Sequence, residues 1–259
     1  MMKRIAWLLM LLTLLCGCTA TGLHPTETQG NAVTTMRPTF PTIPTSSVLA
    51  TTLPTIPTSI PTETVGPAPV VNMYAGAIAD YLLPLETYSD ERQFAPEMVM
   101  IHFSSAVQID EKDPYNMDLI RNIFVTYEVS THYIIDRDGT IRCYIPEDRV
   151  AWHAGKGSWP LNDKYTNAMN QYAIGIELVA MGSKKDMSPY MSGKEYDAMD
   201  QSLMGFTPAQ YDALSGLVRD LCLRYGIPMD RDHIIGHKEY APKKPDPGEL
   251  FDWAWVLGL

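Results

Sequence analysis

Basic residues are scarce in this chain, and so are cysteines and long hydrophobic runs. There are 20 Lys and Arg against 30 Asp and Glu, which gives a formal net charge of −10. This acidic balance makes nucleic acid a poor candidate partner. Four cysteines among 259 residues are too few for a scaffold built on disulfides. The longest mostly apolar run, from Ile5 to Leu15, is too short to cross a membrane comfortably.

The first 18 residues are typical of an export signal. Lys3 and Arg4 precede the apolar run, which ends in Leu15-Cys16-Gly17-Cys18. This ending resembles a bacterial lipobox, and we expect lipidation at Cys18, because Leu15 is too bulky for cleavage before Cys16. The sequence thus predicts an exported lipoprotein, anchored to a membrane of the cell envelope through its lipid. An ordinary cleaved secretory signal and a spanning helix are the alternatives.

A compositional break follows, and residues 19–72 are rich in Thr, Pro and Ser. The hexapeptide PTIPTS occurs twice, at Pro41 to Ser46 and at Pro54 to Ser59. Proline removes hydrogen-bond donors, and a stretch with so few large apolar residues cannot form a core. We predict a disordered tether that favours the polyproline II conformation and extends about 3.1 Å per residue. It could equally be a spacer whose length has no function.

The remaining residues, 73–259, are expected to form one α/β domain with a central mixed sheet flanked by helices. Apolar runs at residues 97–105, 172–180 and 233–237 predict buried strands, and residues 132–145 predict a hairpin that turns at Asp138-Gly139. Helical spacing of apolar residues predicts a helix within 116–129. A second helix should begin after Thr207 and end at Gly226. Cys143 and Cys222 could pair or remain free thiols.

Two histidines stand at the ends of predicted strands, where α/β proteins gather their ligands. His102 closes VMIH and His237 closes IIGH, and Asp246 follows between two prolines. Two histidines and a carboxylate can hold a catalytic zinc ion and leave one position for water. Spacing alone does not separate this site from a pair of structural histidines. His233 and His237 are four residues apart, but the β-branched IIG between them and the missing Glu exclude a helical zinc pair.

Glu177 lies inside the apolar run IGIELV, where packing has no use for a carboxylate. Burying an unpaired carboxylate is costly, so its presence in a predicted strand favours a role in a functional site.

Five segments follow one another along the chain: VMIHFSS, STHYIIDRDGTI, AWHAG, IGIELV and GHKEYAPKKPDPG. Taken together and in this order, they resemble zinc-dependent N-acetylmuramoyl-L-alanine amidases of the amidase-2 family. This family is related to the peptidoglycan recognition proteins and to phage lysozymes of the amidase type. The resemblance runs from about Glu97 to Trp253. It implies hydrolysis of the amide between muramic acid and L-alanine, with peptidoglycan or muropeptides as substrate and Zn²⁺ as cofactor.

The resemblance also implies roles for single residues. The zinc ligands would be His102, His237 and Asp246, and Glu177 would be the general base. Lys244 would stabilise the oxyanion, with Lys243 as a rival. Where the phage enzymes carry a tyrosine, this chain has Thr131, so no acid-base role goes to that position. Substrate contacts are expected from His132, Trp152, His153 and Asn170.

The long connection between Met181 and Phe206 should border the cleft. The protein should be a monomer. The alternative to an enzyme is a recognition module that binds peptidoglycan without cutting it, but such relatives typically lack a metal ligand, and this chain retains all three.

Overall fold

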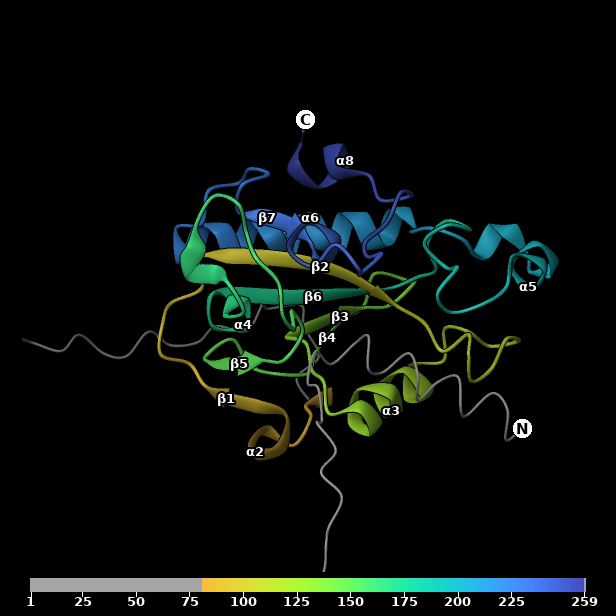
Figure 1. Ribbon diagram of the computed structural model, residues 1–259, viewed down its shortest axis with the longest axis horizontal. Helices are drawn as coiled ribbons and strands as arrows, with labels where there is room; N and C mark the ends of the chain where they lie inside the picture. The colour runs from red at the N-terminus through yellow and green to blue at the C-terminus, as the bar shows by residue number, and fades with distance from the viewer. Residues whose placement is uncertain (1–80, 259) are drawn as a thin grey trace, which may run out of the picture. The chain divides into compact units, whose positions relative to one another are not determined.

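The computed structural model describes residues 81–258, and within them lies a five-stranded mixed sheet with the strand order β4-β3-β6-β2-β7. Figure 1 shows the strands in this order, from β7 at the top to β4. The strands β3, β6, β2 and β7 are parallel, and β4 is antiparallel to β3. The predicted mixed α/β fold and its hairpin are therefore confirmed. The strands are β2 (Met98–Ser104), β3 (Tyr133–Ile135), β4 (Ile141–Cys143), β6 (Ala173–Val179) and β7 (Ile234–Gly236).

The long helix α6 (Pro208–Tyr225) covers one face of this sheet. Its ends follow the sequence signals: Thr207 and Gln210 form a capping box, and Gly226 ends the helix with a φ of +67°. Leu214, Leu217 and neighbouring side chains of α6 pack on the sheet side chains that point toward it. These are alternate residues of β2, β6 and β3, namely Val99, Ile101, Ile174, Ile176, Leu178, Tyr133 and Ile135.

The opposite face carries the residues between these alternate positions, and it is this face that holds the polar groups. The helix α3 (Met117–Tyr127), capped by Asn116, packs Ile120 and Phe124 against Ile134 and Val179. On the same face of the sheet, His102 of β2 and Glu177 of β6 stand opposite each other in the parallel register. The period of two in these buried strands thus places both side chains away from α6.

Short elements complete the described part of the chain. The strands β1 (Ser89–Glu91) and β5 (Arg149–Ala151) form a separate antiparallel pair. The α-helices are α2 (Leu85–Tyr88), α4 (Met169–Tyr172), α5 (Gly193–Ala198), α7 (His237–Tyr240) and α8 (Trp253–Leu257), and the 3-10 helices are η2 (Asp163–Tyr165) and η3 (Gln201–Leu203). His237 therefore begins a helical turn instead of closing the strand as predicted.

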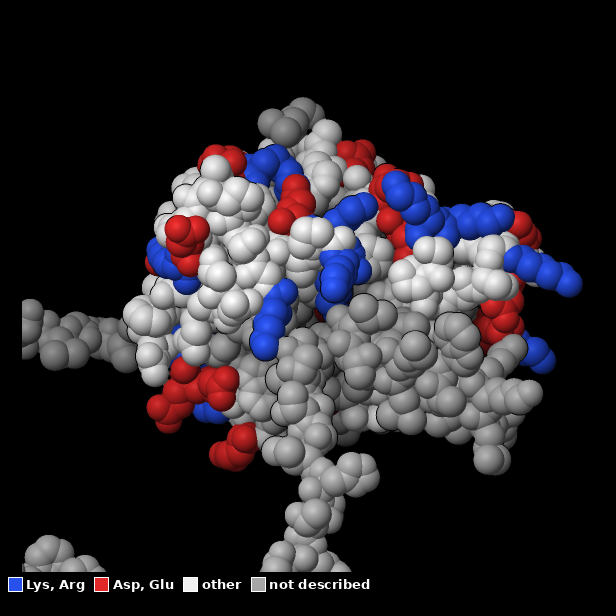
Figure 2. Space-filling view, in the orientation of Figure 1, with Lys and Arg blue, Asp and Glu red and all other residues white. Residues whose placement is uncertain are grey.

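The structure decides between the two alternatives left open for the cysteines of the domain. Cys143 and Cys222 are buried free thiols and do not pair. Among the described residues, no helix combines the length and apolar character that crossing a bilayer requires. Figure 2 shows acidic and basic side chains interspersed over the described part of the face in view. The predicted signal and tether, residues 1–72, lie outside the described residues.

Candidate metal centre

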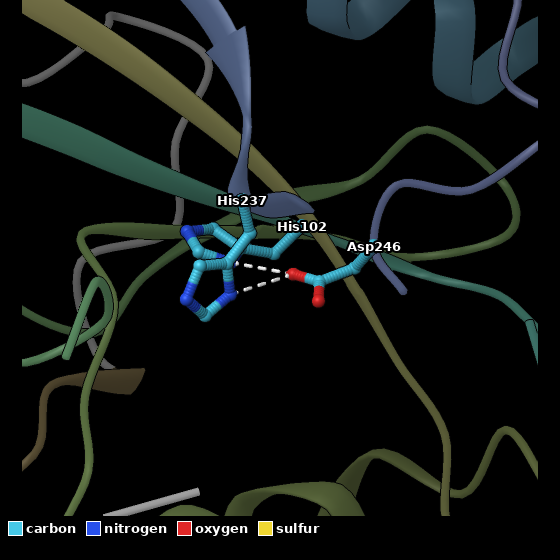
Figure 3. Close-up of side chains that lie close together, drawn as sticks. All are labelled: His102, His237 and Asp246. Atoms are coloured by element: carbon cyan, nitrogen blue, oxygen red, sulfur yellow. Dashed lines mark hydrogen bonds and ion pairs between the residues drawn. The ribbon is translucent and has the colours of Figure 1, made fainter. Parts of the chain in front are cut away.

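His102, His237 and Asp246 converge at one end of the sheet, as Figure 3 shows. Asp246 Oδ2 lies 2.8 Å from His102 Nδ1 and 3.0 Å from His237 Nδ1, and the two Nδ1 atoms are 3.1 Å apart. All three side chains are buried. The three predicted ligands therefore form a compact group that could hold a metal ion.

Local structure explains how residues so far apart in the chain meet. His102 lies near the end of β2, and β7 pairs beside β2, so His237 emerges next to it. The loop that carries Asp246 folds back because the Asp246 carbonyl accepts from the Lys238 backbone N–H at 2.9 Å. Gly236 permits this approach, since a Cβ there would lie 2.5 Å from Pro247 Cδ.

The second nitrogen of each histidine is held by another group, which orients the two rings. His237 Nε2 lies 3.1 Å from the carbonyl of Ala154, which can only accept, so a proton on Nε2 would leave the Nδ1 lone pair for a metal ion. His102 Nε2 lies 3.1 Å from His153 Nδ1. Such hydrogen bonds fix the tautomer and the direction of metal-binding imidazoles.

The electrostatics of the group favour a cation. Burial lowers the pKa of His102 to about 4, which keeps its ring neutral. Burial alone would raise the pKa of Asp246, but its contacts with His237 and His102 hold that pKa well below the ordinary value. Neutral imidazoles and an ionised carboxylate are the protonation states in which these residues bind metals.

Glu177 shares a cavity of about 420 Å³ with this group. Burial, and next the charge of Asp246, raise the pKa of Glu177 to about 8. Its Oε2 atom is buried and has no hydrogen-bond partner among the described residues. A carboxyl group that has a raised pKa and an oxygen without a hydrogen-bond partner, beside a candidate metal-binding group, is suited to accept and return a proton near neutral pH.

Lys244, the favoured of the two predicted oxyanion lysines, also lines this cavity, whereas Lys243 is exposed and does not. The positive charge of Lys244 acts to lower the pKa of both His102 and Glu177, which line the same cavity. Within residues 81–258, the structure thus brings the lysine, the carboxyl group and the three candidate ligands into one pocket.

Three of the four residues expected to contact substrate line the pocket, namely Trp152, His153 and Asn170. Asn170 Oδ1 accepts from the backbone N–H groups of His153 and Ala154 at 3.1 and 2.8 Å, so it also holds this loop in place. Trp152 Nε1 donates to Asp90 at 2.8 Å.

His132 does not lie in the pocket wall, which corrects the expectation drawn from the sequence. It is fully buried, and its Nδ1 accepts from the Gly175 N–H at 2.9 Å. Its Nε2 lies 2.9 Å from Arg92 Nη2 and 3.1 Å from the Arg149 carbonyl. Because protein groups contact both ring nitrogens, His132 does not offer them to a ligand. It packs against the ring of His153, which lines the pocket.

His132, His153, His102 and His237 lie in a row. Successive ring centroids are 5.8, 5.1 and 4.6 Å apart, and each pair meets edge to face. The row needs a glycine at position 175, because a Cβ there would lie 2.5 Å from the His153 ring. Sequence reasoning missed this arrangement, although the Gly within IGIELV is a signal that another group approaches the strand closely.

The connection between β6 and α6 borders the pocket, as expected, and contributes Met187 and Tyr190. The sequence indicated only the segment and neither residue. The Ala154 carbonyl that orients His237 was also missed, and a backbone acceptor of this kind leaves no signal in the sequence.

The chain is similar to known amidases. A family model described as N-acetylmuramoyl-L-alanine amidase matches residues 92–249. The chain is 35% identical over 132 residues to 1,6-anhydro-N-acetylmuramyl-L-alanine amidase AmpD of Citrobacter freundii, covering 51% of this chain and 57% of that protein. It is 34% identical over 134 residues to N-acetylmuramoyl-L-alanine amidase AmiD of Escherichia coli K12, covering 49% and 42%. The chain thus spans about half the length of these relatives.

A solved structure shares the fold. The crystal structure of a selenomethionine derivative of AmpD superposes with a TM-score of 0.52 at 28% sequence identity, covering 72% of this chain and 95% of that one. The family match spans more than half of the chain and includes all the residues that converge on the candidate metal centre. The chain therefore belongs to the N-acetylmuramoyl-L-alanine amidase family.

Proposed function

We propose that this protein hydrolyses the amide bond between N-acetylmuramic acid and L-alanine in peptidoglycan or its muropeptide fragments. The observation that carries the proposal is the convergence of His102, His237 and Asp246 in one pocket with Glu177 and Lys244. The names of the relatives, both N-acetylmuramoyl- or anhydro-N-acetylmuramyl-L-alanine amidases, supply the substrate class.

Zinc is the metal that fits this donor set best. Two imidazole nitrogens and one carboxylate oxygen form the three-ligand set of catalytic zinc sites, which leave a fourth position open. Donor atoms held tetrahedrally about 2.0–2.1 Å from a zinc ion lie roughly 3.3 Å apart. The separations of 2.8, 3.0 and 3.1 Å are slightly shorter than this and need only a small outward movement.

The residues of this chain would then divide the work of amide hydrolysis. When bound, zinc lowers the pKa of a water molecule and polarises the scissile carbonyl. Glu177 takes the proton of the attacking water and delivers it to the departing amine of L-alanine. Lys244 places positive charge beside the carbonyl oxygen as that oxygen becomes negative, which favours the transition state over the ground state.

The proposed substrate, peptidoglycan, is consistent with the expected location of the protein at the cell envelope. Export and a lipid on Cys18 would hold the domain at the cell envelope, and a tether of the composition of residues 19–72 would let it reach peptidoglycan. Support for this part of the proposal comes from the sequence of residues 1–72.

The direct test is digestion of peptidoglycan by the purified protein, with zinc and after chelation. We expect mass spectrometry to detect stem peptides that begin with free L-alanine, and we expect their release to stop on chelation and in Glu177→Ala. A surface variant such as Glu91→Gln should cut normally. If the wild-type protein binds peptidoglycan but releases no peptide with zinc present, it is a recognition module and the roles given to Glu177 and Lys244 are wrong.

A further inference from the structure

The connection between β6 and α6 brings a tyrosine, Tyr190, to the same pocket as Glu177, Lys244 and Asp246. This residue has no role in the mechanism derived above. Its segment is much longer than a simple strand-to-helix connection requires, and long connections in compact domains are commonly functional.

Asp186 anchors the segment to the loop that carries Asp246. It is 2% exposed and accepts from the Ser183 N–H at 3.1 Å, the Ser183 hydroxyl at 2.7 Å and the Glu249 N–H at 2.9 Å. Gly248 allows this contact, because its φ is +85° and a Cβ there would lie 2.5 Å from Asp186. The segment and the metal-binding loop are therefore held together only a few residues from Asp246 and from Tyr190.

Tyr190 itself is held through its backbone. Its N–H donates to the Met187 carbonyl at 2.9 Å, and its carbonyl accepts from Gln108 Nε2 at 2.9 Å. Its side chain packs against an apolar cluster that contains Val107, Met181 and Met187. These contacts position the ring without using its hydroxyl.

Tyr190 lines the cavity that Glu177, Lys244 and Asp246 also line. Burial, and then the charges of Asp246 and Glu177, raise the pKa of Tyr190, so the hydroxyl keeps its proton at neutral pH. Within residues 81–258, the hydrogen bonds of Tyr190 run through its backbone, which leaves the O–H group available as a donor. A phenol that lines this cavity can donate to a carbonyl oxygen of a bound ligand.

We propose that Tyr190 is a further substrate-contacting residue, whose hydroxyl donates a hydrogen bond to a carbonyl oxygen of the muropeptide next to the bond that is cut. This inference rests on the proposed function and deepens it, since it makes the connection between β6 and α6 part of the substrate site.

Tyr190→Phe removes the hydroxyl and keeps the ring, and Tyr81→Phe is the matched control. Tyr81 does not line the pocket, and its hydroxyl donates to Asp118 Oδ1 at an exposed position. The probe is N-acetylmuramoyl-L-alanyl-D-isoglutamine, a small muropeptide that contains the bond. Its cleavage is measured with the zinc-loaded full chain, and its binding is measured by calorimetry with the zinc-free chain, alongside zinc content.

We expect Tyr190→Phe to lower kcat/KM about tenfold or more and to weaken muropeptide binding to the zinc-free protein, with zinc content unchanged. Tyr81→Phe should match the wild type in all three measurements. If the wild type cuts the probe and Tyr190→Phe equals Tyr81→Phe in cleavage and binding, Tyr190 makes no substrate contact, although the proposed function stands. If the wild type neither cuts nor binds the probe, the proposed function fails and the contact fails with it.

Discussion

Among single residues, His153 is a side chain outside the three candidate ligands that contacts one of them. Its Nδ1 lies 3.1 Å from His102 Nε2, so it can accept the proton that His102 must carry there if Nδ1 is to bind zinc. We expect His153→Ala to weaken zinc affinity about 10- to 100-fold, measured by competition with a chelating fluorophore.

His153→Asn is the conservative variant, because its Oδ1 can accept near the position of Nδ1, and it should retain more of the affinity than His153→Ala. The control is His233→Ala, since His233 is partly exposed and pairs with Asp230 away from the site. Equal zinc affinity in His153→Ala and His233→Ala would show that His153 does not position His102.

The raised pKa of Glu177 predicts an effect on folding stability that is separate from catalysis. In the metal-free protein, burial and the charge of Asp246 raise its pKa from 4.5 to about 8. A carboxyl whose pKa is higher in the folded state stabilises the fold while it is protonated, and this stability is lost as the pH rises through the folded pKa. Glu177→Gln, which cannot ionise, should therefore become more stable than the wild type as the pH rises from about 5 to about 9.

The measurement is the free energy of unfolding by denaturant, followed by tryptophan fluorescence across that range in chelator. The gap between Glu177→Gln and wild type should grow to roughly a few kcal/mol. Glu91→Gln, on an exposed position of β1, should track the wild type. Parallel pH curves for Glu177→Gln and wild type would contradict the raised pKa.

Among the elements, the connection between β6 and α6 depends on one buried carboxylate. Asp186→Ala leaves the Ser183 and Glu249 N–H groups without their acceptor, so we expect a loss of about 1–3 kcal/mol in the free energy of unfolding. Amide hydrogen exchange should accelerate in residues 183–191 and 247–250. Asp197→Ala, in the same connection, removes an exposed ion pair with Lys184 and should cost less than about 1 kcal/mol. Exchange rates equal to those of Asp197→Ala would show that Asp186 is not the anchor.

The elements were predictable where the sequence carries a local signal. The apolar runs predicted β2 and β6, Asp138-Gly139 predicted the β3–β4 hairpin, and Thr207 and Gly226 predicted the ends of α6. The short helical turns could not be predicted from the sequence. The helix α7 begins directly at His237, and its four residues carry too little periodicity to distinguish a helical turn from the end of a strand.

At the scale of the whole molecule, the testable expectation is the lipid anchor. Expressed from its full sequence in a bacterium, the protein should incorporate a labelled fatty acid and sediment with membranes. Cys18→Ala should abolish both, whereas Cys16→Ala should abolish neither, because the small Gly17 precedes Cys18 and the bulky Leu15 precedes Cys16. Labelling that persists in Cys18→Ala, or is absent from the wild type, would contradict the lipobox.

The sequence by itself determined which chemical groups are present and which elements carry them: histidines after apolar runs, a carboxylate inside a buried strand, and a proline-flanked aspartate. Only the tertiary structure decided which of these groups meet. His102 and Asp246 are 144 residues apart, and they touch because β2 lies between β6 and β7 in the sheet. The same packing separates His132 from the pocket and sets His153 against His102, because both rings are positioned by contacts with Gly175, which comes from another segment of the chain.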